Sequence, residues 1–265
     1  MAQSPLGLDF RWPPLRRGLA LSGLLASWAV AAAAAQQPDA RFALELEGGA
    51  TWQSYNNVRV PNDSRATRFS LRELAGSGPW ASGRVYLTWR AGRRHELRLL
   101  VAPFSLTETG TPEIPISFAG ADYAAGRPVR ATYTFNSYRL TYRYSIRNAS
   151  RTAAWIGFTA NIRDALIRLE QDGTTSRKDD FGFVPLIHLA GLWRPAPGWH
   201  LSLDADVIAG GPGRAEDVAL KVGRDLGRSW RVQAGYRMVE GGADVASVYT
   251  FAWLHSAVVS IERSL

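Results

Sequence analysis

The sequence of 265 residues contains no cysteine, two methionines and four histidines. Without cysteine there are no disulfides, so the chain is not a small disulfide-stapled domain and must be stabilised by hydrogen bonds and packing. No cluster of His, Cys or carboxylate residues has metal-site spacing, and we expect no metal and no cofactor. After residue 35 there is no apolar run long enough to cross a membrane as a helix. If the chain lies in a membrane, it must therefore be a closed β-barrel, whose backbone groups pair with one another.

The first 35 residues have the pattern of a secretory signal peptide. Arginines precede an apolar run over 18–33, and a row of alanines ending at Ala35 forms the cleavage site. The run is shorter than the roughly 18 residues that a spanning helix needs, so an uncleaved anchor is the weaker interpretation. The chain has more basic than acidic residues, but its basic residues do not form clusters interleaved with aromatic residues. We therefore expect no nucleic-acid binding. The sequence therefore predicts a signal peptide at 1–35 and one exported domain at 36–265.

Apolar and polar side chains alternate along most of the exported part. On an extended chain, Tyr138, Leu140 and Tyr142 lie on one face, while Arg139 and Arg143 lie on the other. A soluble barrel would bury the apolar face, whereas a membrane barrel would turn it to lipid and place the arginines inside. The polar faces carry too many charges for a dry core, which favours the membrane barrel. We therefore predict that Tyr138, Leu140 and Tyr142 face lipid and that the arginines face the lumen.

The sequence predicts an all-β fold: a transmembrane antiparallel up-and-down β-barrel of about ten strands, with eight strands as the alternative. The candidate strands are 41–56, 80–91, 95–106, 129–146, 152–170, 181–194, 199–209, 217–226, 229–240 and 247–262. The connectors AGRR, RNASR, PAPG and LGRS are tight, 57–79 and 107–128 are long, and the others are intermediate. Tight turns belong to the periplasmic side, where an even strand count also places both ends. Tryptophans are expected at strand ends or on apolar faces, at the depth of lipid head groups: Trp80, Trp89, Trp155, Trp193, Trp199, Trp230 and Trp253.

From 40 to 265 the sequence resembles the outer-membrane β-barrels of Gram-negative bacteria, and 213–253 is similar to the C-terminal half of a group of such proteins with no assigned activity. The resemblance implies a barrel over 36–265 in the bacterial outer membrane, in contact with lipid and lipopolysaccharide and inserted by the barrel assembly machinery. We expect a monomer. Barrels of this kind end in an aromatic residue that the assembly machinery reads. This sequence has Leu265 there, and Arg263 stands where an apolar residue is usual.

Twelve charged residues fall on the polar faces and are predicted to point into the lumen: Glu45, Glu47, Arg84, Glu96, Arg98, Arg139, Arg143, Asp204, Asp206, Lys221, Arg231 and Arg237. A ten-stranded barrel is only a little wider than one that side chains can fill, and far narrower than open porins of about 16 to 18 strands. Five acids among seven bases indicate a paired network that plugs the lumen. A narrow channel that weakly favours anions is the alternative. We therefore expect a structural component or a narrow pore with a charged, plugged lumen.

Two features invite comparison with outer-membrane enzymes. A ten-stranded barrel resembles the omptin proteases, which use paired aspartates and an Asp-His pair. Here the aspartates of 204–206 share a face, but His200, near the periplasmic end, shares it more clearly than His188 does. His255-Ser256 resembles lipid A deacylases, yet adjacent residues point to opposite faces of a strand, and the His-x-Ser spacing is absent. We therefore predict no enzymatic activity. The alternatives are an outer-membrane enzyme acting on lipid A or peptides, and a soluble periplasmic ligand-binding barrel.

Overall fold

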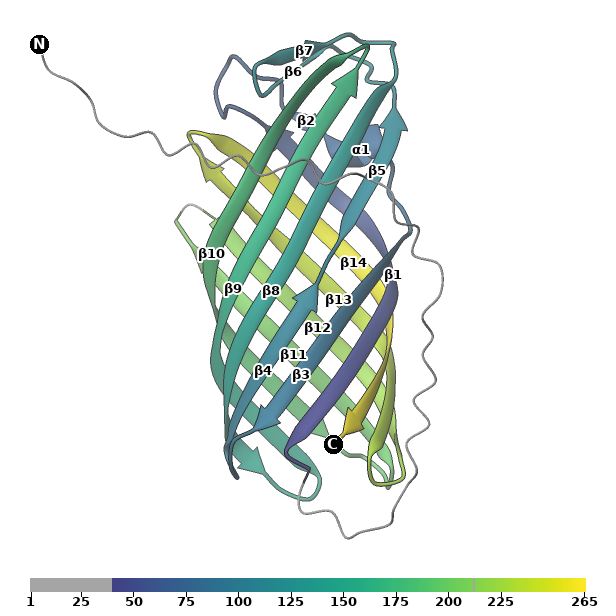
Figure 1. Cartoon of the computed structure of the whole chain (residues 1–265), viewed down its shortest axis with the longest axis vertical. Helices are drawn as coiled ribbons and strands as arrows, with labels where there is room; N and C mark the ends of the chain where they lie inside the picture. The colour runs from purple at the N-terminus through teal and green to yellow at the C-terminus, as the bar shows by residue number, and fades with distance from the viewer. Residues whose placement is uncertain (1–39, 212) are drawn as a thin grey trace, which may run out of the picture. The chain divides into compact units, whose positions relative to one another are not determined.

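The computed structural model describes residues 40–211 and 213–265, which form a closed antiparallel β-barrel (Figure 1). Within these residues ten strands make the wall. They are β1 (Phe42–Arg59), β3 (Trp80–Arg90), β4 (His95–Ala102), β8 (Val129–Asn148), β9 (Thr152–Gln171), β10 (Thr174–Trp193), β11 (Trp199–Gly210), β12 (Gly213–Leu226), β13 (Trp230–Val245) and β14 (Val248–Ser264). Each strand pairs with the next of this series, and β14 closes the barrel against β1. The predicted signal peptide at 1–35 lies outside the described residues.

The ten candidate strands are all present, so the eight-strand alternative is wrong. Several boundaries differ: β12 begins earlier than expected, at Gly213, and β13 runs on to Val245. The largest differences are that β10 begins at Thr174, well before the expected start, and that the strand expected at 95–106 is divided into β4 and β5 (Ser105–Gly110). Both parts pair with β8, and Pro103 lies between them, where its missing N–H cannot donate to the ladder. Asn136 of β8 fills this break, because its side-chain oxygen accepts the next backbone N–H at 3.1 Å.

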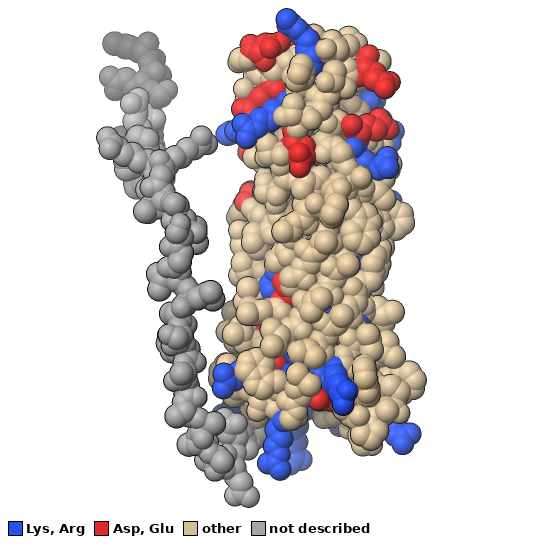
Figure 2. All heavy atoms as spheres, turned by 90° about the vertical axis from the view of Figure 1, so that its right-hand side faces the viewer, with Lys and Arg blue, Asp and Glu red and all other residues tan. Residues whose placement is uncertain are grey.

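The outer face of the wall carries an apolar belt. Alternation turns these side chains away from the lumen and leaves them exposed, as in Phe158, which is 71% exposed. Figure 2 shows the belt as an uncharged band between charged residues at the two ends of the barrel. A soluble barrel would bury these side chains, so the alternative of a soluble ligand-binding barrel is wrong. Tyr138, Leu140 and Tyr142 lie on this outer face, as predicted for residues that meet lipid.

Five of the predicted interface tryptophans are exposed on the outer face: Trp89, Trp193, Trp199, Trp230 and Trp253. The other two point inward, which corrects the prediction. Trp155 lies against the Arg143 guanidinium, whose carbon is 5.3 Å from the ring centre. Trp80 donates its Nε1–H to Glu108 at 2.8 Å and packs against the apolar core of the barrel. Both rings lie inside the barrel, where the polar edge of Trp80 has a partner in Glu108 and the ring of Trp155 has one in Arg143.

The two ends of the barrel differ in their connections. The periplasmic end carries the four turns that were predicted to be tight, and both described chain ends lie there, since Leu265 donates its backbone N–H to Phe42 at 2.8 Å. At the outer end, the connections β9–β10, β11–β12 and β13–β14 are also tight, although the sequence indicated intermediate lengths. The strands themselves extend into these segments, because their turn residues allow the ladder to continue to the tip.

The two long outer segments fold into the mouth of the barrel. They contain β2 (Phe69–Ser70), α1 (Leu71–Ala75), β6 (Ile116–Phe118) and β7 (Ala121–Tyr123), seen at the top of Figure 1. Their side chains pack with those of the upper wall into one buried apolar core, here called the apolar cap: Val58, Val60, Phe69, Leu71, Leu74, Ala75, Leu106, Ile116, Phe118, Tyr123, Val129, Ala131, Tyr133, Ile167, Leu169, Ala252 and Leu254. The segments expected as loops therefore close the outer end.

Local capping fixes the single turn of helix in this cap. Ser70 stands at the N-cap of α1, and its Oγ accepts the backbone N–H of Glu73 at 3.2 Å. This leaves Leu71 and Leu74 on the buried side of the turn. Within residues 40–211 and 213–265, no helix combines the length and the apolar character needed to cross a membrane.

Candidate functional site

The wall strands bring all twelve predicted lumen charges to the inner face of the barrel, and none of the twelve is an exposed residue. Each forms an ion pair with a residue of another strand. Six residues, all buried except the partly buried Arg84, form the central cluster: Glu47, Arg84, Arg139, Asp206, Asp217 and Arg237. The others pair on its periplasmic side: Glu45–Lys221, Arg98–Asp204, Glu96–Arg143 and Arg231–Glu262.

Asp217 stands at the centre of this cluster and was missed in the sequence. Its carboxylate pairs with Arg84 and Arg139 at 2.8 Å each and with Arg237 at 2.5 Å, and only 3% of the side chain is exposed. Asp217 is the first residue of the strand expected at 217–226, but it was not among the charges predicted to face the lumen. The signal was present, because Asp217 and Lys221 are four residues apart and share one face of an extended chain.

Glu47 forms the other half of the cluster. One of its oxygens accepts from Arg237 Nε at 2.8 Å, and the second accepts from Lys221 Nζ at 3.0 Å. Lys221 also donates to Glu45 at 2.6 Å and so connects the cluster to the periplasmic pairs. The central cluster contains three carboxylates and three guanidinium groups, whose side chains are at most 13% exposed. Charges shut off from water in this way must balance one another, since an unpaired buried ion is costly.

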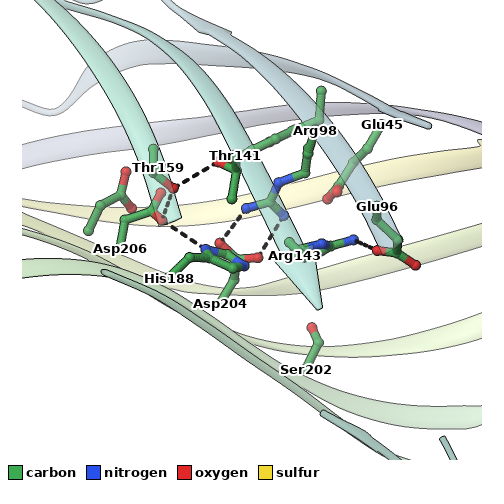
Figure 3. Close-up of polar contacts among 12 residues, drawn as sticks. Glu45, Glu96, Arg98, Thr141, Arg143, Thr159, His188, Ser202, Asp204 and Asp206 are labelled. Atoms are coloured by element: carbon green, nitrogen blue, oxygen red, sulfur yellow. Dashed lines mark hydrogen bonds and ion pairs between the residues drawn. The ribbon is translucent and has the colours of Figure 1, made fainter. Parts of the chain in front are cut away.

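His188 belongs to the same interior network, although the sequence placed it on the face of the two aspartates less clearly than His200, which is buried on that same face of β11. His188 is fully buried, and its Nδ1 lies 2.8 Å from Asp206 Oδ1 (Figure 3). The same carboxylate oxygen accepts from Thr159 Oγ1 at 2.6 Å. Within the described residues, His188 Nε2 is buried without a hydrogen-bond partner. His200 lies instead beside Asp225, at 3.5 Å.

The paired aspartates are each held by an arginine. Arg98 donates two hydrogen bonds to Asp204, at 2.6 and 2.8 Å, and Arg139 donates to Asp206 at 2.9 Å. Such bidentate and charge-assisted bonds fix both carboxylates as ionised acceptors. His255 and Ser256 lie on opposite faces of β14, as strand alternation requires. Among residues 40–211 and 213–265, no group of three or more His, Cys, Asp or Glu side chains is arranged to hold a metal ion.

The lumen changes in character along its axis. On the periplasmic side of the central cluster lies a cavity of about 320 Å³ lined by charged and polar side chains, among them Arg90, Trp155 and Ser202. Between the central cluster and the apolar cap the space is only about 40 Å³, bordered by Glu47, Arg237 and Leu254. A water molecule needs roughly 10–15 Å³ of such space, so this gap has room for only a few. The larger charged cavity therefore lies on the periplasmic side of the central cluster, and little free space separates the central cluster from the apolar cap.

Comparison with known proteins gives a likeness in fold. No known family and no curated protein matches the sequence. The outer membrane protease OmpT from Escherichia coli is similar over 86% of this chain and 97% of its own, with 11% identity and a TM-score of 0.50. Neisserial surface protein A is similar over 84% and 97%, with 11% identity and a TM-score of 0.35. Ail of Yersinia pestis is similar over 83% and 99%, with 8% identity and a TM-score of 0.36.

The closed barrel, its apolar belt and the likeness to OmpT define the class of protein. The chain has the fold of a Gram-negative outer-membrane β-barrel, and ten strands form the wall in the part of the chain that the structure describes. An apolar belt on the outside of a closed sheet is stable only where lipid covers it, and single-chain barrels of this kind belong to the outer membrane. The predictions of a transmembrane barrel and of an outer-membrane location are confirmed.

Proposed function

We propose that this protein is a non-enzymatic outer-membrane barrel whose lumen is closed at rest by two stacked plugs. The observation that carries the proposal is the central cluster, in which Asp217 joins arginines from β3, β8 and β13 across the lumen. A set of balanced ion pairs spanning the interior replaces the water that a pore would contain. The protein then serves as a structural component of the membrane, or as a pore that conducts only when both plugs are displaced.

The apolar cap supports the same conclusion from the other end. A hydrated ion that passed the central cluster would next meet a core in which Leu71, Phe118 and Tyr123 are each 1% exposed. Apolar constrictions exclude ions because the ions would have to lose their hydration there. The lipopolysaccharide contacts, insertion by the barrel assembly machinery and the monomeric state remain predictions.

An outer-membrane enzyme is the second candidate, and the His188–Asp206 hydrogen bond together with the fold of OmpT is what favours it. A general base must reach the proton that it removes from a substrate. His188 is fully buried inside the barrel, and Asp206 is already bonded to Arg139 and Thr159. Burial and saturation of this pair support a structural role over a catalytic one.

The proposal is tested by the conductance of the folded protein in a planar lipid bilayer. We expect no discrete current steps from the unmodified protein, because both plugs are in place. A variant in which 60–79 is shortened to a minimal turn and Asp217 is replaced by Asn should conduct, since it lacks part of each plug. Regular single-channel steps from the unmodified protein would refute the closed lumen.

A further inference from the structure

The wall of the barrel has an opening beside β10. Residues Ile187–Trp193 of β10 pair with β11, whereas, among the described residues, Thr174–Leu186 pair with β9 alone. Figure 1 shows the hairpins β11–β12 and β13–β14 ending below the tops of β8, β9 and β10. On the outer face of this part of β10, Phe181 and Phe183 are 76% and 62% exposed. The charged Arg177 follows them toward the tip, so the opening spans the level at which lipid chains give way to head groups.

A pocket of about 180 Å³ lies in this part of the barrel, between the inner face of β8–β10 and the upper ends of β13 and β14. Its apolar lining includes Tyr133 and Ile167 of the apolar cap, with Ala165, Ala243 and Val248 around them. This volume is below the roughly 300–1,000 Å³ typical of drug-sized ligands. The pocket therefore has room for a single slender hydrocarbon segment.

The polar part of the pocket is cationic. Lys178, Arg163 and Asp180 line it, and Arg163 forms an ion pair with Asp180. Within residues 40–211 and 213–265 Lys178 has no ion-pair partner, and Arg163 Nε is buried without a hydrogen-bond partner. One carboxylate against two cations leaves one positive charge, which an anionic group would compensate with charge-assisted hydrogen bonds.

We propose that this pocket binds one hydrocarbon chain with an anionic head group, which enters through the opening beside β10. The chain lies against Tyr133 and Ile167, and the carboxylate or phosphate head lies between Lys178 and Arg163. The site is independent of whether the lumen conducts, because no residue of the central cluster lines it.

The probe is parinaric acid, a fluorescent fatty acid whose emission rises in apolar surroundings, added to the folded protein in a non-ionic detergent. We expect saturable binding that dodecanoate and dodecyl phosphate reverse and that dodecyltrimethylammonium does not. Lys178→Gln should weaken binding about tenfold, which corresponds to about 1.4 kcal/mol. Its matched control is Arg177→Gln, on the neighbouring residue of β10, which is exposed and paired with Asp179 and should leave binding unchanged.

A substitution that fills the pocket gives a second, independent test of the proposal. Ala243→Phe adds a ring to the pocket lining and should abolish saturable binding, while Ala234→Phe, on the exposed outer face of the same strand, should not. Faster gel migration of unheated protein verifies that each variant is folded. The proposal is overturned if Ala243→Phe binds parinaric acid like the unmodified protein, or if Lys178→Gln and Arg177→Gln behave alike.

The source of the ligand is identified by solvent extraction of protein purified from membranes. A free fatty acid in the extract indicates a ligand taken up from solution, whereas a phosphate-bearing lipid indicates a ligand from the outer leaflet. Either result supports the proposal, because both ligands carry a hydrocarbon chain and an anionic head group. The anionic head group would be contradicted if the extract contained a cationic or uncharged lipid in place of a fatty acid or a phosphate-bearing lipid, and if Ala243→Phe lost that lipid.

Discussion

At the scale of single residues, Asp217 forms ion pairs with three arginines, and only 3% of its side chain is exposed. Asp217→Asn keeps the shape of the side chain but removes its charge, and it leaves Arg84, Arg139 and Arg237 undercompensated. Breaking a buried ion pair in this way costs about 3 to 5 kcal/mol. We expect a loss of this size in the free energy of unfolding, measured from urea titrations of the folded barrel in detergent.

Asp225→Asn is the matched control for this prediction. Asp225 lies on the same strand and pairs with Arg231, but 31% of its side chain is exposed. Exposed pairs contribute about 0 to 1 kcal/mol, so the control should shift the unfolding midpoint little. Similar losses in the two variants would mean that water reaches both positions equally, and the closed-lumen account would fail.

Strand alternation alone predicted the inward side of all twelve lumen charges, because the period of two is a local property of the chain. Their partners could not be predicted in the same way. Asp206 meets Arg139 and His188 because the register and closure of the barrel bring β8, β10 and β11 together, and no local pattern encodes that meeting. Asp217 was missed for a simpler reason, since it stands at the first position of the expected strand 217–226, next to the charged residues of the preceding connection.

At the scale of an element, β12 tests the depth of the apolar belt. Leu220 and Leu226 both face outward, with 53% and 48% exposed, but Leu226 lies at the end of the strand next to the turn. Leu220→Arg should destabilise the folded barrel by roughly 2 to 4 kcal/mol, and Leu226→Arg by about 0 to 1 kcal/mol, because the cost falls toward the interface. The measurement is unfolding in the presence of lipid vesicles. Equal destabilisation by Leu220→Arg and Leu226→Arg would contradict the prediction, because both positions would then lie at the same depth in the membrane.

The elements were predictable to different degrees. The ten wall strands could be read from alternation, because lipid on one side and charge on the other enforce a strict pattern. The apolar cap could not, because residues such as Leu71 and Phe118 stand in segments rich in turn residues, and only the width left inside ten strands shows that they fold inward. The division of β4 and β5 at Pro103 follows from the missing N–H of proline, but its position against Asn136 depends on the register.

At the scale of the whole molecule, the proposed function requires that the lumen be closed at two levels in series. Charged and polar side chains line the periplasmic cavity of about 320 Å³; in the proposal the central cluster closes it, and the apolar cap closes the other end. Two closures in series would account for the small space, about 40 Å³, between the central cluster and the apolar cap. The absence of cysteine from the sequence makes this arrangement directly measurable, since any introduced thiol is unique.

The most direct test is the reactivity of single introduced cysteines toward a small charged methanethiosulfonate reagent. Ser202→Cys lines the periplasmic cavity, Thr51→Cys lies in the narrow space between the central cluster and the apolar cap, and Ser64→Cys is exposed at the outer end. We predict fast labelling at 202 and 64 and strong protection at 51, which is lost when the protein is unfolded in urea. Labelling at 51 as fast as at 202 in the folded protein would show a continuous aqueous lumen and would contradict the account.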